Sequence, residues 1–112
     1  MGDAPDGDGF TLTTGEGPRP GPTLVCPEDM TPVAPDVLRG WCVRLLACEG
    51  ATLAVDLRGT RYLQSHHLGV LADGWAEALK AGCRMVLLIS PRLRRVFEAS
   101  GFDRVFELLE EE

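Results

Sequence analysis

The sequence predicts a single α/β domain with a central mixed β-sheet and helices packed against it. Residues 53–57 and 85–89 are short, nearly continuous apolar runs, which are typical of interior strands buried on both faces. Segments with apolar residues at helical spacing alternate with these runs, near residues 35–49, 65–81 and 91–100. With 112 residues, of which 45% are hydrophobic, the chain is long enough to bury one core.

The N-terminal part predicts a tail followed by a hairpin. Residues 1–9 are acidic and rich in glycine, so we expect a disordered tail ahead of a folded domain at residues 10–112. Residues 10–14 alternate between polar and apolar side chains, and residues 23–26 have the pattern of a second short strand. The intervening residues 15–22 are dense in glycine and proline, which predicts a loop that joins the two strands into a hairpin.

The first helix is predicted to start at Pro35, because proline is tolerated in the first helical turn, and to end at Gly50, because glycine suits a C-terminal cap. Its apolar spacing indicates a buried face made of Val37, Leu38, Trp41, Leu45 and either Cys42 or Cys48. A strand at residues 52–57 follows, and Asp56 and Gly59 end its apolar run.

The second helix is predicted at residues 65–81, with Ser65 as its N-cap and Gly82 at its C-terminal end. Its apolar residues recur at intervals of three, four and four, which places on one face Leu68, Leu71, Trp75 and Leu79. We expect this face to cover the interior strands.

The C-terminal part repeats the strand–helix pattern. The strand at residues 85–89 leads into a helix with Ser90 as its N-cap and Pro91 at its first position, and Gly101 ends this helix. Its core face is expected to contain Leu93, Val96 and Phe97. Residues 105–109 predict a short edge strand.

The composition argues against several classes of function. The formal net charge of −6 disfavours direct nucleic-acid binding, which needs a basic face. No apolar stretch has the length of a membrane span or of a signal core, so we expect no direct membrane insertion and a cytoplasmic location. The cysteines lack a C-x-x-C pair and a histidine at metal-ligand spacing, which predicts no metal site. They are interpreted as small buried residues of a reducing compartment, at Cys26, Cys42, Cys48 and Cys83.

Ser65 is the polar residue with the clearest chemical potential. A hydroxyl at a helix N-terminus lies beside free N–H groups and the positive end of the helix dipole, so a phosphoryl group on Ser65 would be stabilised. The simpler alternative is that Ser65 only caps its helix. We predict no enzyme activity, since sequence spacing places neither His66 nor His67 to accept the Ser65 proton and no third group orients them.

Three short runs around Ser65 resemble the signature of the STAS domain, which occurs in bacterial anti-sigma factor antagonists. The runs are Val-Asp-Leu at 55–57, Tyr-Leu-Gln-Ser at 62–65 and Leu-Gly-Val-Leu at 68–71. Residues 84–106 resemble the C-terminal half of the same family, so the resemblance covers the chain from residue 51 onwards. It implies a STAS-like single domain, in agreement with the α/β class predicted above.

The resemblance also implies a function. The serine that matches Ser65 is the phosphorylation site in the family, and its kinase is the partner anti-sigma factor. The unphosphorylated domain binds this kinase and frees a sigma factor for transcription, and the phosphate abolishes the complex, which is called partner switching. The residues expected to contact the partner are Gln64, Ser65, His66, His67, Leu68 and Gly69.

The motif of this chain differs from the family at three positions. The family motif usually reads Asp-Ser-Ser-Gly-Leu-Gly, whereas residues 64–69 read Gln-Ser-His-His-Leu-Gly. The acid before the phosphoacceptor, the neighbouring hydroxyl and a small residue are therefore absent. These differences support an alternative, in which the chain is a divergent STAS binding or scaffold module of a signalling or transporter complex and is not phosphorylated. In both interpretations the protein acts by binding, without a cofactor.

Overall fold

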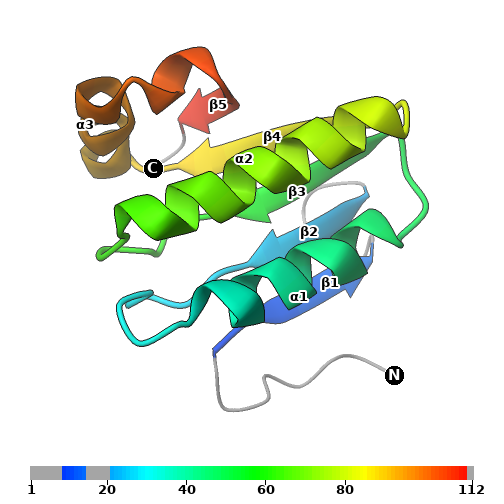
Figure 1. The fold of residues 1–112 in the computed structure, drawn as a ribbon, viewed down its shortest axis with the longest axis horizontal. Coiled ribbons are helices and arrows are strands. Elements are labelled where there is room, and N and C mark those ends of the chain that lie inside the picture. The colour runs from blue at the N-terminus through cyan, green and yellow to red at the C-terminus, as the bar shows by residue number, and fades with distance from the viewer. Residues whose placement is uncertain (1–8, 15–20, 111–112) are drawn as a thin grey trace.

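The computed structural model describes residues 9–14 and 21–110, which form a five-stranded sheet and three α-helices (Figure 1). In chain order the elements are β1 (Thr11–Thr14), β2 (Pro22–Val25), α1 (Pro35–Leu46), β3 (Thr52–Asp56), α2 (Ser65–Lys80), β4 (Arg84–Ile89), α3 (Pro91–Ser100), the short 3-10 helix η1 (Phe102–Arg104) and β5 (Glu107–Glu110). The predicted α/β class with a central mixed sheet is confirmed. The predicted tail and the 15–22 loop lie mainly outside the described residues.

The sheet has the strand order β1-β2-β3-β4-β5. β1 pairs antiparallel with β2, as the predicted hairpin requires, and the other neighbours are parallel. One row across the sheet aligns Leu24, Val55, Leu87 and Leu108. Because β2, β3 and β4 run in the same direction, the segments that follow them leave the sheet at one edge. Both α2 and α3 therefore begin at that edge (Figure 1).

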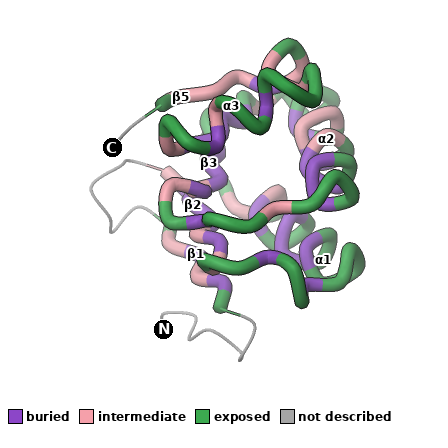
Figure 2. Tube along the Cα trace, turned by 90° about the vertical axis from the view of Figure 1, so that its left-hand side faces the viewer, coloured by how far each residue is buried: buried purple, intermediate pink, exposed green. Residues whose placement is uncertain are grey.

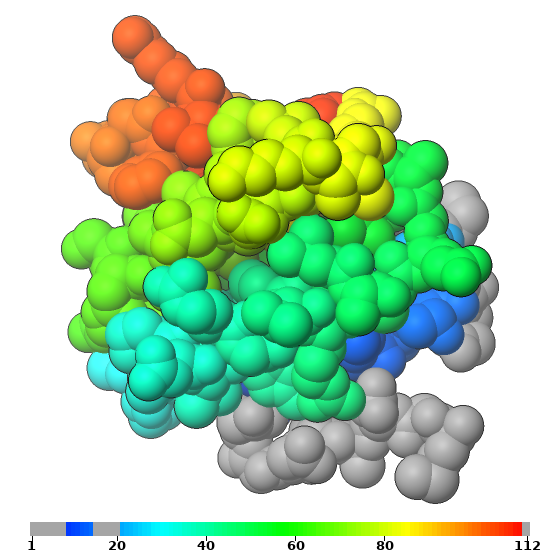
Figure 3. All heavy atoms as spheres, turned by 45° about the vertical axis from the view of Figure 1, so that its right-hand side comes forward, coloured from blue at the N-terminus to red at the C-terminus, as the bar shows by residue number. Residues whose placement is uncertain are grey.

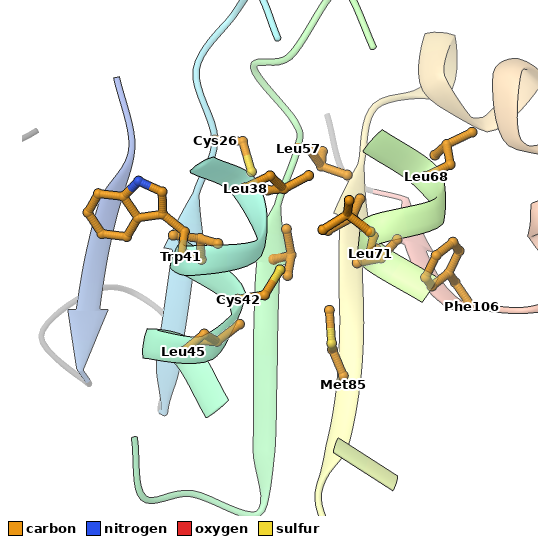
Figure 4. Packing of buried hydrophobic residues seen from close by; sticks show 14 of the residues in the cluster. Cys26, Leu38, Trp41, Cys42, Leu45, Leu57, Leu68, Leu71, Met85 and Phe106 are labelled. Carbon is orange, nitrogen blue, oxygen red and sulfur yellow. The ribbon is translucent and has the colours of Figure 1, made fainter. Parts of the chain in front are cut away.

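The main core lies between the sheet and the helices. α1 and α2 lie side by side across one face of the sheet, and their side chains form a continuous layer over it (Figures 1 and 3). Cys42, Leu71 and Met85 point into the same interior (Figure 4). At the β1 end of this core, the rings of Phe10 and Trp41 stack with their centroids 5.4 Å apart.

The strands β3 and β4 are buried on both faces, as predicted. Leu53, Val55 and Leu57 join the main core, whereas Ala54 belongs to a second cluster on the opposite face of the sheet. The residues of that second cluster are Ala54, Val86 and Leu88, with Leu109 packed against them. Figure 2 shows the buried residues concentrated in these strands and in the sheet-facing turns of α1 and α2.

The predicted buried face of α2 is wrong in part. Leu79 is 52% exposed. Apart from Leu68, the buried positions of the helix are His67, Val70, Leu71, Gly74 and Ala78, which fall within about 100° of one another at about 100° per residue. Leu68, Trp75 and Leu79 lie roughly 90° away on the flank, and only Leu68 is fully covered there. The small residues that face α1 carry no strong hydrophobic signal, which is why the larger flanking residues dominated the pattern.

Some element ends and core assignments also differ from the prediction. Val37 and Val96 are each 39% exposed, so neither is a core residue. α1 ends at Leu46 with Ala47 as its C-cap, four residues before the expected end. Of the two candidate cysteines of α1, Cys42 is the buried one. The last strand begins at Glu107 because residues 102–104 first form η1.

The predicted boundaries of α3 are confirmed. The Ser90 hydroxyl accepts a hydrogen bond from the Leu93 N–H at 3.3 Å, and Pro91 occupies the first helical position. Gly101 has φ +82°, a left-handed conformation that ends the helix and that residues with a Cβ adopt only with strain. In the part of the chain that the structure describes, no helix combines the length and apolarity needed to cross a membrane.

We expect Gly74→Ala to stabilise the protein by about 1 kcal/mol, because alanine has the higher helix propensity. A Cβ at this position would lie 3.6 Å from the nearest Cys42 atoms and 3.8 Å from Met85 Cε, which are ordinary contacts. Gly101→Ala is the matched control and should lower stability, since its φ is positive. Urea unfolding of both variants measures the difference. A loss of stability in Gly74→Ala would contradict this packing of α1 on α2.

The thiols are expected to react in two classes. Burial raises the pKa of the Cys42 thiol to about 11, and burial together with the nearby Cys42 and Asp56 raises that of Cys26 well above its ordinary value. Cys48 and Cys83 are only partly buried. A disulfide-exchange reagent at pH 8 should therefore modify two thiols quickly and two only on unfolding. Removal of the fast phase by Cys48→Ser with Cys83→Ser would support the assignment, and four equal rates would contradict it.

Candidate functional site at the start of α2

The candidate site rests on two loops that are joined by backbone hydrogen bonds. The loop between β2 and α1 (residues 27–34) and the segment between β3 and α2 (residues 57–64) pair through a bridge at Asp29 and Tyr62. The Met30 N–H donates to the Tyr62 carbonyl at 2.9 Å, and the Arg61 N–H donates to the Glu28 carbonyl at 2.7 Å. We call these two segments the loop platform. Its internal hydrogen bonds fix the position of the chain that enters α2.

A buried hydroxyl adds a further link within the loop platform. Thr60 is 2% exposed and its hydroxyl donates to the Pro27 carbonyl at 2.8 Å. Below the platform, Met30 and Val33 are buried in the main core. The platform therefore has both hydrogen bonds and apolar contacts that hold it on the sheet.

The N-cap of α2 is Gln64, which corrects the expectation that Ser65 caps the helix. Gln64 has extended dihedral angles (φ −104°, ψ 162°), and its carbonyl accepts hydrogen bonds from His67 N–H at 3.0 Å and Leu68 N–H at 3.4 Å. Ser65 is therefore the first helical residue. Its side chain is exposed, and among the described residues no group forms a hydrogen bond with its hydroxyl. This hydroxyl is open to a partner and lies beside free N–H groups of the first turn.

His67, at the third helical position, supplies the reciprocal side-chain bond of the α2 cap. Its ring is fully buried, and Nδ1 accepts a hydrogen bond from the Gln64 N–H at 3.1 Å. This is the reciprocal bond of a capping box, which a glutamate or glutamine usually makes. Because Nδ1 accepts, the proton of the neutral ring lies on Nε2, which donates to the Val33 carbonyl at 2.9 Å. One side chain thus ties the start of α2 to the loop before α1.

His66 extends the same network to the surface. Its Nε2 lies 3.1 Å from His67 Nε2, and the two ring centroids are 4.1 Å apart. The single Nε2 proton of His67 is donated to the Val33 carbonyl, so His66 Nε2 can only share this proton as a second acceptor. Among the described residues no hydrogen bond joins Ser65 to His66 or His67, so the nucleophile–base contact of a hydrolase is not formed between these three residues.

The structure divides the six expected partner contacts into two groups. Gln64, Ser65, His66 and Gly69 are exposed, whereas His67 is 0% and Leu68 2% exposed. The expectation of direct contact is therefore corrected for His67 and Leu68. Their side chains support the site from the core side, and the exposed residues form its surface.

Two residues of this surface were missed by sequence reasoning. Tyr62 is 49% exposed, and the Arg92 guanidinium carbon lies 6.0 Å from the centroid of its ring. Arg92 belongs to the first turn of α3, far from Tyr62 in the sequence. The parallel pairing of β3 with β4 brings the two together, and no local pattern indicates it. One property of the sequence does single out Tyr62, which is the only tyrosine of the chain.

Asp56, the acidic residue at the end of β3, forms an ion pair within the chain. Asp56 Oδ2 lies 2.7 Å from Arg58 Nη2, and Asp56 Oδ1 accepts from the Arg58 side chain and backbone, each at 3.0 Å. The Asp56 side chain is only 12% exposed. This pair closes the turn after β3, so Asp56 acts here as a structural acid.

Comparison with known proteins adds no assignment to this geometry. No known family model matches the chain, and a search of curated proteins found no similar sequence.

We expect stability to fall as the pH is lowered from about 7 to 5. Burial lowers the pKa of His67 below its ordinary value of 6.5, while its bond to the Val33 carbonyl acts in the opposite direction and the charge of His66 lowers it again. The unfolded chain therefore binds a proton that the folded chain excludes, so this contribution is complete above pH 6.5 and is lost as the pH falls toward the lowered pKa. For one proton the slope is at most about 1.4 kcal/mol per pH unit.

Urea unfolding at several pH values measures this slope. His67→Gln is the informative variant, because glutamine at this position can still accept from the Gln64 N–H but does not titrate. It should flatten the dependence between pH 7 and 5, whereas His66→Gln should retain a slope. Equal slopes in the wild type and in His67→Gln would contradict the assignment.

Proposed function

We propose that this protein is a non-enzymatic regulatory domain of the STAS type, which acts as an anti-sigma factor antagonist. The unphosphorylated domain binds an anti-sigma factor with serine kinase activity through the start of α2, in the cytoplasm. The kinase transfers the γ-phosphoryl group of ATP to Ser65 Oγ, with loss of the hydroxyl proton and release of ADP. The phosphorylated domain then leaves its partner.

The observation that carries this proposal is the position of Ser65. Its hydroxyl is exposed at the first position of α2, and the first turn of this helix contains no acidic side chain. A phosphoryl group there is stabilised by the N–H groups and the dipole of α2. The same group adds nearly two negative charges and three acceptor oxygens to a contact surface. Such a modification weakens a complex that buries Ser65 through repulsion and desolvation.

The loop platform supports a role in binding. Its backbone hydrogen bonds and the His67 network hold Tyr62, Gln64 and His66 around Ser65 before any partner arrives. A preorganised surface loses little conformational entropy on association. Tyrosine and arginine, which meet here at Tyr62 and Arg92, are also among the residue types enriched at energetically important contacts.

One observation favours the alternative of a binding or scaffold module without phosphorylation. Gln64 and His66 occupy positions where the family has an acid and a hydroxyl, and His66 Nε2 is held against the buried His67. These side chains form a network without any phosphate. In that case the surface around Ser65 contacts a constant partner, such as a component of a signalling or transporter complex.

Affinity capture from a native-host lysate distinguishes the two functions. We expect a kinase-type ATPase to co-purify with the wild type and with Ser65→Ala and to be lost from Ser65→Asp. Ser100→Asp is the matched control, because it adds the same charge at an exposed serine at the end of α3. With the purified partner, Ser65→Asp should weaken binding by about tenfold or more. Recovery of the same partners from all four chains would contradict the phosphorylation switch and favour the scaffold module.

A further inference from the structure

Arg92 lies beside the candidate site and has no carboxylate partner among the described residues. Within the described residues, the contact found for its guanidinium is the Tyr62 ring, at 6.0 Å from the centroid. The neighbouring arginines of the loop platform differ, because Arg58 pairs with Asp56 and Arg61 with Glu28. Arg92 therefore carries a positive charge that no acidic side chain of the described chain neutralises.

The topology of the sheet places Arg92 close to the entrance of α2. β3 and β4 are parallel neighbours, and the Leu57 N–H donates to the Leu88 carbonyl at 2.8 Å where they end. α3 begins directly after β4, and the 57–64 segment leads from β3 into α2. Figure 1 shows α3 and the start of α2 at the same end of the sheet. The first turns of α2 and α3 thus share one edge.

The contact with Tyr62 places Arg92 beside the segment that enters α2. The backbone of Tyr62 is fixed on both sides, since its N–H donates to Glu28 and its carbonyl accepts from Met30. Ser65 follows Tyr62 by three positions, so their Cα atoms are at most about 11 Å apart. A contact between Arg92 and a phosphate on Ser65 requires the guanidinium to turn away from the Tyr62 ring.

The electrostatic surroundings favour an anion at Ser65. No acidic residue lies in the first turn of α2, and the residue before Ser65 is the neutral Gln64. On the loop platform, Glu28 lies 3.6 Å from Arg61, and the Asp29 carboxylate accepts from the Thr31 N–H. A phosphate on Ser65 would therefore meet the α2 dipole without an acidic residue in the first turn of the helix.

We infer that Arg92 is the intramolecular receptor for a phosphoryl group on Ser65. The guanidinium donates two parallel hydrogen bonds to phosphate oxygens, a geometry that arginine favours. In doing so it leaves the Tyr62 ring, so phosphorylation changes the shape of the surface as well as its charge. This inference rests on the proposed function, because it takes Ser65 as the residue that is phosphorylated.

The test places phosphoserine at position 65 during synthesis of the full chain, so that no kinase or partner is needed. A phosphorus NMR titration then gives the midpoint of the second phosphate ionisation, which is ordinarily near pH 6. We expect Arg92→Gln to raise this midpoint by about half a pH unit or more, because the guanidinium favours the dianion. Arg104→Gln is the matched control, since it removes the same charge from the exposed η1 residue beyond the far end of α3. A midpoint that moves equally in both variants would overturn the inference.

Tyr62 provides a second and independent readout. As the only tyrosine, it gives a single fluorine NMR signal when the chain is labelled with 3-fluorotyrosine. Phosphoserine at position 65 should shift this signal, and the shift should be absent in Arg92→Gln. If Arg92→Gln fails to fold, Arg92→Lys retains the charge without the planar fork and should give a smaller effect than the wild type. A tyrosine signal that does not respond to the phosphate in the wild type would overturn the inference.

The results separate this inference from the proposed function. Partner binding that is lost on phosphorylation, together with a phosphate midpoint that does not depend on Arg92, overturns only the role of Arg92. If the phosphate midpoint depends on Arg92 but partner binding is the same with and without the phosphate, the role of Arg92 as receptor is supported and the proposed phosphorylation switch is overturned.

Discussion

The imidazole of His67 accepts a hydrogen bond from the backbone of Gln64 and donates one to the backbone of Val33, so one buried side chain joins the first turn of α2 to the segment before α1. Both partners are backbone groups, which constrain the ring to one tautomer. A buried ring with both nitrogens satisfied fixes its surroundings, because loss of either bond would leave a buried polar group unpaired. The arrangement of the exposed residues around Ser65 depends on this contact.

The parallel pairing of β2, β3 and β4 is the second condition for the site. Parallel strands require crossover helices, and each crossover returns the next strand to the same direction. The segments that leave the carboxyl ends of these strands therefore gather at one edge, which is where open α/β sheets commonly bind their ligands. In this protein that edge brings Arg92 of α3 against Tyr62, three positions before Ser65. The stability of the fold and the proposed function thus depend on the same strand topology.

The site has a clear division between support and contact. His67, Leu68 and Thr60 are buried and hold the loops, whereas Gln64, Ser65 and His66 face outward. Substitutions in the first group are expected to act through folding, and those in the second through binding. The proposed switch uses this division, since a phosphate on an exposed hydroxyl changes the surface while the core below stays packed. Arg92 would then be the residue of the same chain that binds the phosphate.

Several features followed from local sequence alone. The apolar runs of β3 and β4, the Ser90 cap and the Gly101 end of α3 are properties of short segments, so propensity and pattern were enough to predict them. The sequence also predicted that Ser65 lies at the start of a helix, although the N-cap is one residue earlier, at Gln64.

Other features were decided by contacts between distant segments. The buried face of α2 follows its packing on α1, where Gly74 meets Cys42, and glycine carries no hydrophobic signal in a sequence. The burial of His67 depends on the Val33 carbonyl, and the contact of Arg92 with Tyr62 depends on strand order. A polar residue enters a core only where a partner from elsewhere in the chain satisfies it, and that partner exists only in the folded structure.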